Sequence, residues 1–242
     1  MKQWRFPLSG PAMAPLLPID LVVFDCDGVL VDSERITGGV LARMLRELDA
    51  GVDTDGLAER CIGRSTADTQ ALAAERLGRP LPAGFEASYG ARSRAALAED
   101  VVLMPGVAGM LDALALPCAI ASNGLRAKMA ITLAATGLLA RFDGRWFGID
   151  DVAHGKPAPD LYLLAANALG ARPPHCVVVE DSPTGIAAGL AAGMTVLGYA
   201  GSLPVGHLLD AGAHAAFDDM AHLPALLDAF GRAAPRALVA AN

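Results

Sequence analysis

Three aspartates fall within the nine residues of FDCDGVLVD, which spans residues 24–32. Two of them, Asp25 and Asp27, directly follow the apolar run LVVF and so stand where a buried strand would end. Carboxylates strongly prefer water to an apolar interior, so at such a point they need either solvent or a cation. The segment therefore allows two interpretations: acids that face solvent at a strand end, or acids that gather around a bound cation.

Other polar residues follow the later strand-like runs of the chain. Ser122 and Asn123 come after PCAIA, and Lys156 follows RWFGI after a short loop, in HGKPAPD. Glu180 and Asp181 close the run HCVVV. Ligands of open parallel sheets bind beyond the carboxyl ends of the strands. We therefore predict that these residues collect, with the first two acids, along one edge of a sheet.

The charge of this set indicates which ligand it can bind. Its carboxylates outnumber the single ammonium of Lys156, so a phosphate dianion would be repelled unless a divalent cation joined it. Mg²⁺ suits hard oxygen ligands and usually takes few carboxylates, several waters and a substrate phosphate oxygen. Ser122 and the amides at the start of the following helix can hold phosphate oxygens. The residues thus favour a Mg²⁺ cofactor and a small phosphorylated substrate.

Each of these groups also has an interpretation without chemistry. Residues 122–124 match a turn with a helix cap, and the acids at 180–181 match those that favour a helix N-terminus. Lys156 could be a solvated loop lysine. Asp32 and Glu34 are interpreted as the start of a helical segment, and the five histidines, which show no ligand spacing, as structural or surface residues.

The bulk composition bounds the class of protein. With 242 residues, 53% of them hydrophobic, and a mean hydropathy of +0.40, the chain can bury a sizeable core. A net charge of −7 without a basic cluster argues against nucleic-acid binding, and no apolar run approaches the ~20 residues that span a bilayer. Prolines interrupt the N-terminal segment, which does not resemble a signal peptide, and four dispersed cysteines fit a reducing cytosol. We expect a soluble cytoplasmic protein that binds neither nucleic acid nor membrane, as a monomer or weak dimer.

Short apolar runs without alternation predict strands that are covered on both faces. Helical segments separate the later runs, and this alternation predicts an α/β fold with a doubly wound parallel sheet. Residues 33–103 read as helices only, which predicts an inserted all-helical domain. The expected strands are 20–25, 117–122, 145–149, 175–180 and 194–199, and the expected parts are a flexible extension (1–18), a core (19–32 and 104–232), the helical insert (33–103) and a tail (233–242).

Four segments together resemble the motifs of the haloacid-dehalogenase-like phosphotransferases. They are DCDGVLVDSE, AIASNG, GKPAPD and VVVEDS, which occur in that family's order, and the resemblance covers roughly residues 20–200. It implies a Rossmann-like core, with the helical insert as a cap domain. The subgroup with such a cap includes sugar-phosphate phosphatases and beta-phosphoglucomutase.

The resemblance implies a role for each matching residue. Asp25 is the expected nucleophile that forms an aspartyl-phosphate, and Asp27 the general acid that later activates water. Ser122 and Lys156 are expected to bind the transferring phosphoryl group and to stabilise its charge. The remaining expected substrate contacts are Gly28, Asn123, Gly124 and Arg64, and the expected Mg²⁺ ligands are Asp25, Asp27 through its carbonyl oxygen, Asp181, and Glu180 either directly or through water.

Within the insert, the segment CIGRSTADT resembles the cap loop that reaches the substrate in related proteins. Arg64 is therefore a candidate contact for the leaving group, and its alternative is a solvated residue at a helix start. Ser65 or Thr66 would cap the next helix.

We expect a Mg²⁺-dependent phosphomonoester hydrolase that acts on a small metabolite, a sugar phosphate by class. The mutase of this subgroup carries a histidine ten residues after its second motif aspartate, where this chain has Thr37, and a lysine beside the glycine of its cap loop, which this chain lacks. Dehalogenases of the family lack the acid that Asp27 supplies. The alternative from another class is a non-catalytic protein. In a phosphoaspartate receiver the aspartate ends the third strand and no helical insert is present, whereas a degenerate metabolite-binding protein would lack part of the catalytic set, which is complete here.

Overall fold

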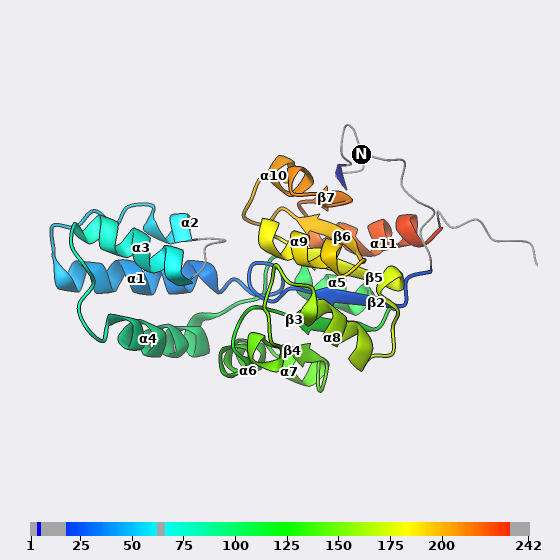
Figure 1. The fold of residues 1–242 in the computed structure, drawn as a ribbon, viewed down its shortest axis with the longest axis horizontal. Helices are drawn as coiled ribbons and strands as arrows, with labels where there is room; N and C mark the ends of the chain where they lie inside the picture. Colours follow the sequence, from blue (N-terminus) through cyan, green and yellow to red (C-terminus); the bar gives the residue numbers. More distant parts are fainter. Residues whose placement is uncertain (1–3, 6–17, 62–65, 233–242) are drawn as a thin grey trace, which may run out of the picture.

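The computed structural model describes residues 4–5, 18–61 and 66–232. In these residues one seven-stranded sheet has the strand order β1-β7-β6-β5-β2-β3-β4 (Figure 1). Strands β2 to β7 run parallel, and β1 pairs antiparallel with β7. The predicted parallel α/β sheet is confirmed. The strands are β1 (Trp4–Arg5), β2 (Leu21–Phe24), β3 (Cys118–Ala121), β4 (Trp146–Phe147), β5 (Cys176–Glu180), β6 (Thr195–Tyr199) and β7 (Ala215–Phe217).

Helices cover both faces of this sheet. Strand β2 shows the reason, because Val22 and Phe24 belong to the apolar core on one face and Leu21 and Val23 to the core on the other, all of them fully buried. A strand covered on both faces has no polar alternation, as its sequence indicated. On the first face lie α5 (Val107–Ala113), α6 (Arg126–Ala135), α7 (Leu138–Arg141) and α11 (Leu223–Arg232), and on the second α8 (Asp160–Ala168), α9 (Pro183–Ala191) and α10 (Val205–Asp210).

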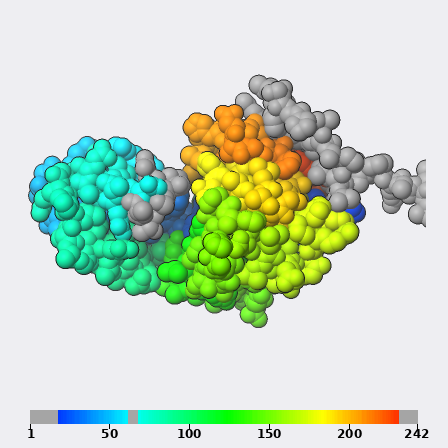
Figure 2. Space-filling model, in the orientation of Figure 1, coloured from blue at the N-terminus to red at the C-terminus, as the bar shows by residue number. Residues whose placement is uncertain are grey.

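The four helices that follow β2 in the chain form a block beside one end of the sheet (Figure 1, left). They share an apolar core of their own, separate from the two cores of the sheet. Helix α4 of the block packs against α6 of the sheet-bearing part. In the space-filling view a hollow separates the two parts (Figure 2). The helices are α1 (Glu34–Leu48), α2 (Leu57–Cys61), α3 (Thr66–Leu77) and α4 (Phe85–Asp100).

Each strand predicted from the sequence contains an observed strand. The sequence interpretation missed β1 and β7, and it missed the helices α2, α5, α7, α10 and α11. The two-residue strand β1 lies inside the segment that was expected to be a flexible extension, and it pairs with β7. Residues 6–17 and 233–242 lie outside the described residues. In the part of the chain that the structure describes, no helix is long and apolar enough to cross a membrane.

Candidate active site

The carboxyl ends of β2, β3 and β5 meet at one edge of the sheet, and polar residues follow each of them. Asp25 comes directly after β2, Ser122 directly after β3, and Glu180 is the last residue of β5. Lys156 reaches the same edge from the loop between β4 and α8. A cleft of about 820 Å³ opens there between the sheet and the helices α1 and α4. It brings together the predicted residues Asp25, Asp27, Ser122, Asn123, Gly124, Lys156, Glu180 and Asp181.

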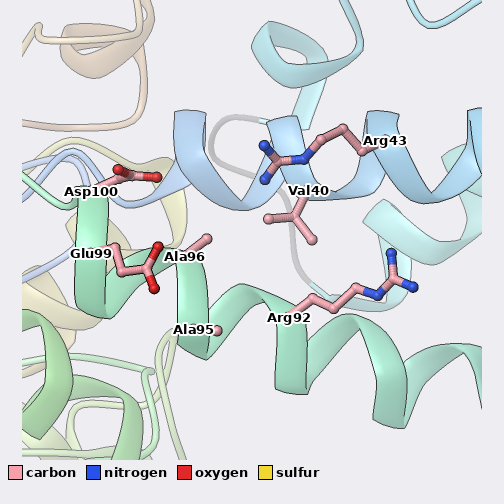
Figure 3. Close-up of a pocket in the computed structure, with 7 residues that line it drawn as sticks. All are labelled: Val40, Arg43, Arg92, Ala95, Ala96, Glu99 and Asp100. Carbon is pink, nitrogen blue, oxygen red and sulfur yellow. The ribbon is translucent and has the colours of Figure 1, made fainter.

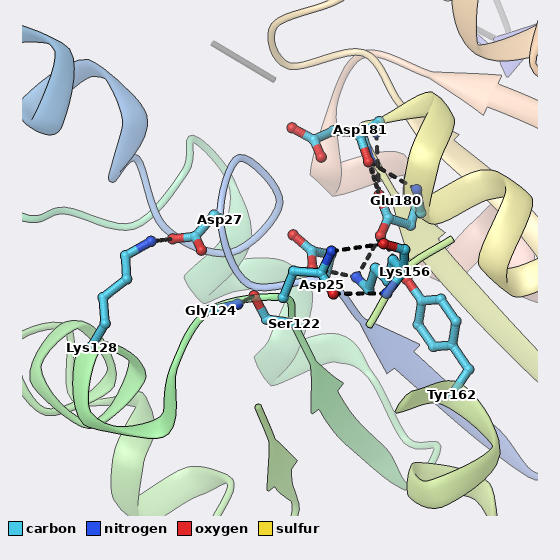
Figure 4. Close-up of polar contacts among 12 residues, drawn as sticks. Asp25, Asp27, Ser122, Gly124, Lys128, Lys156, Tyr162, Glu180 and Asp181 are labelled. Carbon is cyan, nitrogen blue, oxygen red and sulfur yellow. Dashed lines mark hydrogen bonds and ion pairs between the residues drawn. The ribbon is translucent and has the colours of Figure 1, made fainter. Parts of the chain in front are cut away.

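Lys156 lies between two carboxylates at the bottom of this cleft (Figure 4). Its Nζ donates to Oδ1 of Asp25 at 2.5 Å and to Oε1 of Glu180 at 2.6 Å. Burial alone would lower the pKa of Lys156, but the two neighbouring carboxylates raise it above its ordinary value. The side chain therefore remains an ammonium ion although it is only 4% exposed.

Asp25 has an unusual acidity in this environment. Its pKa is raised to about 7, because burial and the negative charges of Glu180 and Asp27 together outweigh the opposing effect of Lys156. Asp25 therefore keeps its proton to a higher pH than an ordinary aspartate does. A further cation beside Asp25 would favour its ionised, nucleophilic form.

Asp27 is held by two donors that the sequence interpretation did not include. Its Oδ1 accepts a hydrogen bond from Nζ of Lys128 at 2.6 Å and another from Oγ of Ser33. Burial raises the pKa of Asp27, but the charge of Lys128 and the two hydrogen bonds outweigh burial, so the pKa lies below its ordinary value. In this state of the protein Asp27 is ionised. Figure 4 shows the pair apart from the Lys156 cluster, with Lys128 reaching up from α6.

The turn after β3 carries Ser122 and Gly124, which both line the cleft. The backbone N–H of Gly124 donates to Oγ of Ser122 at 3.0 Å. A β-carbon on Gly124 would lie 3.4 Å from Oγ of Ser122 and 3.5 Å from Oδ2 of Asp27. Residue 124 therefore lies beside both the Ser122 hydroxyl and the carboxylate of the candidate general acid.

Asn123 uses its side chain on the backbone of Lys156. Its Oδ1 accepts from the Lys156 N–H at 2.8 Å, and its Nδ2 donates to the Lys156 carbonyl oxygen at 3.1 Å. This two-bond contact fixes the lysine loop to the end of β3. Binding of phosphate by Asn123 remains a prediction, while the structure shows how its amide orients Lys156.

Gly28 is required by the position of Asp181. Gly28 has a φ of +78°, and a β-carbon there would lie 2.0 Å from Oδ2 of Asp181. Burial raises the pKa of Asp181 well above its ordinary value, and the charges of Glu180 and Asp25 raise it further. The single positive charge of Lys156 therefore does not balance the charges of the two buried carboxyls, Asp25 and Asp181, when both are ionised.

These residues can be tested for fit to the expected Mg²⁺ ion. Among the described residues, no three acidic, histidine or cysteine side chains converge as a metal site. A Mg²⁺ site needs fewer protein side chains than that, because the ion is usually held by one or two carboxylates together with waters and substrate phosphate oxygens. The carboxylates of Asp25 and Asp181 and the carbonyl oxygen of Asp27 fit that requirement, and a divalent cation would relieve the repulsion between the buried acids.

Tyr162 also belongs to the site and was not predicted. Its hydroxyl donates to Oε1 of Glu180 at 2.6 Å, and the ammonium of Lys156 lies 4.7 Å from the centre of its ring. The position of Arg64 lies outside the described residues, so its contact with the substrate stays a prediction.

A second hollow, of about 330 Å³, lies between α1 and α4 (Figure 3). The guanidinium of Arg92 beside it donates to both carboxylate oxygens of Glu47 at 2.7 Å. Arg43 and the acids Glu99 and Asp100 complete its charged lining. None of the described residues that line this hollow comes from the four motifs, so the cleft at the strand ends is the candidate active site.

The parallel α/β sheet with a cleft of acidic, hydroxyl and lysine side chains at its strand ends agrees with the comparison with known families. Residues 19–193 match the model of the haloacid dehalogenase-like hydrolases. The chain belongs to this family and is an enzyme, a hydrolase. The resemblance inferred from the four motifs is thereby confirmed.

Individual relatives support the same assignment. The chain is 32% identical over 180 residues to the 6-phosphogluconate phosphatase of Escherichia coli (strain K12), which covers 74% of this chain and 81% of that protein. A haloacid dehalogenase-family hydrolase from Deinococcus radiodurans R1, solved with bound phosphate and sodium, is 36% identical with a TM-score of 0.76, over 88% of this chain and 97% of that one. A haloacid dehalogenase-like protein from Agrobacterium tumefaciens is 33% identical with a TM-score of 0.77, over 87% and 98% of the two chains.

Proposed function

We propose that this chain is a Mg²⁺-dependent phosphomonoester hydrolase that works through an aspartyl-phosphate on Asp25. The observation that carries the proposal is the buried ammonium of Lys156, 2.5 Å from Oδ1 of Asp25 at the bottom of the cleft. This cation allows a phosphate dianion to approach a carboxylate that would otherwise repel it. The name of the Escherichia coli relative supports a small sugar phosphate or sugar-acid phosphate as the substrate.

In the first half of the reaction a carboxylate oxygen of Asp25 attacks phosphorus in line with the leaving group. The bond from Asp25 to phosphorus forms while the bond from phosphorus to the ester oxygen breaks. Ser122 and Lys156 hold the phosphoryl oxygens as charge develops on them. Asp27 gives a proton to the departing oxygen, a step that typically contributes about 10²–10⁴-fold to a rate.

In the second half a water molecule attacks the phosphorus of the aspartyl-phosphate. Asp27 accepts a proton from that water, inorganic phosphate leaves, and Asp25 is regenerated. The ion pair with Lys128 keeps Asp27 in the carboxylate form that this base step requires. The acid step requires a proton on Asp27, and therefore a weaker contact with Lys128 once the substrate is bound.

Mg²⁺ would be held by the carboxylates of Asp25 and Asp181 and by the carbonyl oxygen of Asp27, with Glu180 as the further motif acid. When bound, it supplies positive charge that offsets the charge of the phosphate. The ion would thus add to the positive charge that Lys156 already supplies beside Asp25.

The helical block would act as the cap domain over residues 33–103. Its closure would exclude water and bring polar groups to the leaving group. The described residues that it contributes to the cleft include Glu34, Thr37, Thr69, Glu86, Tyr89, Ser93 and Arg94.

A screen of phosphorylated metabolites with Mg²⁺, with released phosphate as the readout, tests the proposed function. We expect phosphate release from sugar phosphates, and loss of that release on chelation of the metal. Interconversion of glucose 1-phosphate and glucose 6-phosphate is assayed in parallel, and isomerisation without net phosphate release would favour the mutase.

Thr37, which stands where the mutase has its histidine, donates its hydroxyl to the Glu34 carbonyl oxygen at 3.1 Å.

A further inference from the structure

The carboxylate of Glu180 is saturated with donors from the protein itself. Its Oε1 accepts from Nζ of Lys156 and from the hydroxyl of Tyr162, both at 2.6 Å. Its Oε2 accepts from the backbone N–H of Asp181 at 3.1 Å, and from the backbone N–H and the hydroxyl of Ser182 at 3.2 Å and 3.0 Å. A carboxylate offers about four lone-pair sites. These five donors leave Glu180 no lone pair for a metal ion.

The surroundings of Glu180 also restrict any change in its orientation. The residue is 1% exposed, and a β-carbon on Gly185 would lie only 1.7 Å from its Oε1. Ser182, the N-cap of α9, accepts from the Gly185 N–H at 3.1 Å while it donates to Glu180. The carboxylate thus lies against the first turn of α9, where a negative charge is favourable.

Tyr162 supplies the donor that comes from outside the motif. It lies in α8, is fully buried, and contacts both partners of the ion pair, Glu180 through its hydroxyl and Lys156 through its ring. Without the hydroxyl, Oε1 of Glu180 would lose one of its two donors and gain a free lone pair. The tyrosine hydroxyl therefore keeps Glu180 directed at Lys156.

We propose that Tyr162 and Glu180 are positioning residues that together hold the Lys156 ammonium against Asp25, and that Glu180 is not a direct ligand of the metal. The side-chain ligands of Mg²⁺ would then be Asp25 and Asp181. This inference rests on the proposed function for its metal and its reaction. The absence of three converging acidic groups among the described residues agrees with it.

The adjacent acids Glu180 and Asp181 offer a matched pair of variants. Glu180→Gln and Asp181→Asn each replace a carboxylate by a neutral amide of the same shape, so their effects on Mg²⁺ binding compare the two residues as ligands. We expect the Mg²⁺ Kd of the substrate-free protein, measured by calorimetry, to rise at least about tenfold more in Asp181→Asn than in Glu180→Gln. Equal weakening in the two variants, or stronger weakening in Glu180→Gln, would overturn the inference.

Tyr162→Phe removes the hydroxyl and keeps the ring. We expect kcat to fall about tenfold, with KM and the Mg²⁺ Kd within about twofold of the wild type. A merely structural hydroxyl would lower the Tm and leave kcat unchanged well below that temperature, and this result would overturn the role of Tyr162. Tyr199→Phe, at a buried tyrosine that packs on Phe217, is the control for loss of a hydroxyl and should keep the wild-type kcat.

The double variant Tyr162→Phe/Glu180→Gln tests whether the two residues act as one unit. Because both act on Lys156, we expect its loss of kcat to be smaller than the product of the two single losses. Multiplicative losses would contradict a shared role. The outcomes separate this inference from the proposed function. If the wild type releases phosphate but Glu180→Gln and Asp181→Asn weaken Mg²⁺ binding equally, only this inference is refuted. If the wild type releases no phosphate but the two variants differ in Mg²⁺ binding as expected, only the proposed function is refuted.

Discussion

The ammonium of Lys128 lies 2.6 Å from Oδ1 of Asp27, although 101 residues separate the two in the chain. The contact joins α6 to the loop that follows β2. It is only partly buried, with the lysine side chain 29% exposed, so solvent and ligands can reach it. Together with the hydroxyl of Ser33 it decides how readily Asp27 holds a proton.

Replacement of Lys128 is expected to shift the pH profile of the enzyme. Lys128→Met removes the charge that lowers the pKa of Asp27, so this pKa should rise. With p-nitrophenyl phosphate, whose leaving group needs no proton, the base step should limit turnover. The acidic limb of kcat should therefore move to higher pH. Lys128→Arg, which keeps the charge, serves as the control, and an unmoved limb in Lys128→Met would exclude this role.

The raised pKa of Asp25 predicts how metal and pH act on stability. The unfolded chain loses this proton near the ordinary value of 3.8, whereas the folded protein keeps it up to about 7. The metal-free protein therefore binds more protons folded than unfolded in that window, and its free energy of unfolding falls as pH rises through it. Asp181, whose pKa is also raised, acts in the same direction.

Mg²⁺ binds the ionised carboxyls, so its stabilising effect should grow with pH. We expect an excess of Mg²⁺ to raise the Tm more at about pH 8 than at about pH 6. Thermal unfolding with and without the metal measures the difference. Asp25→Asn should reduce this dependence on pH, and an equal gain in Tm at both pH values would contradict the role of the acids in metal binding.

Gly28→Ala tests the close approach to Asp181. The substitution combines a positive φ with a contact of 2.0 Å to Oδ2, so we expect a loss of about 1–3 kcal/mol in the free energy of unfolding. Displacement of Asp181 should also weaken Mg²⁺ binding. Gly56→Ala is the matched control, because Gly56 has a φ of +62° with nothing within 4 Å of the added carbon. If both variants bind Mg²⁺ like the wild type, Asp181 does not need its observed position.

Much of the site could be predicted because it follows a local rule. Asp25, Ser122 and Glu180 each stand at the end of an apolar run, and the ends of neighbouring parallel strands meet at one edge. The burial of β2 on both faces also follows from its sequence alone. These features can be predicted from the order of the elements along the chain, without knowledge of how the helices pack.

The residues that the sequence interpretation missed depend on helix packing. Lys128 is the third residue of α6, and only the rotation of that helix on the sheet directs its side chain to Asp27. Tyr162 reads as an ordinary core aromatic, and its ring does belong to the apolar core. Its hydroxyl donates to Glu180, which lies 18 residues later in the chain, at the end of β5. The three-residue strand β7, Ala-Ala-Phe, is too short and too rich in alanine to stand out.

The most direct test asks whether phosphorus becomes bonded to Asp25 during turnover. The enzyme is mixed with substrate and Mg²⁺, quenched in acid within one turnover, and digested for mass spectrometry. We predict a phosphoryl group on the peptide that contains Asp25, and no turnover by a folded Asp25→Asn variant. Full turnover without any label on that peptide, or substantial metal-dependent activity in Asp25→Asn, would contradict the account.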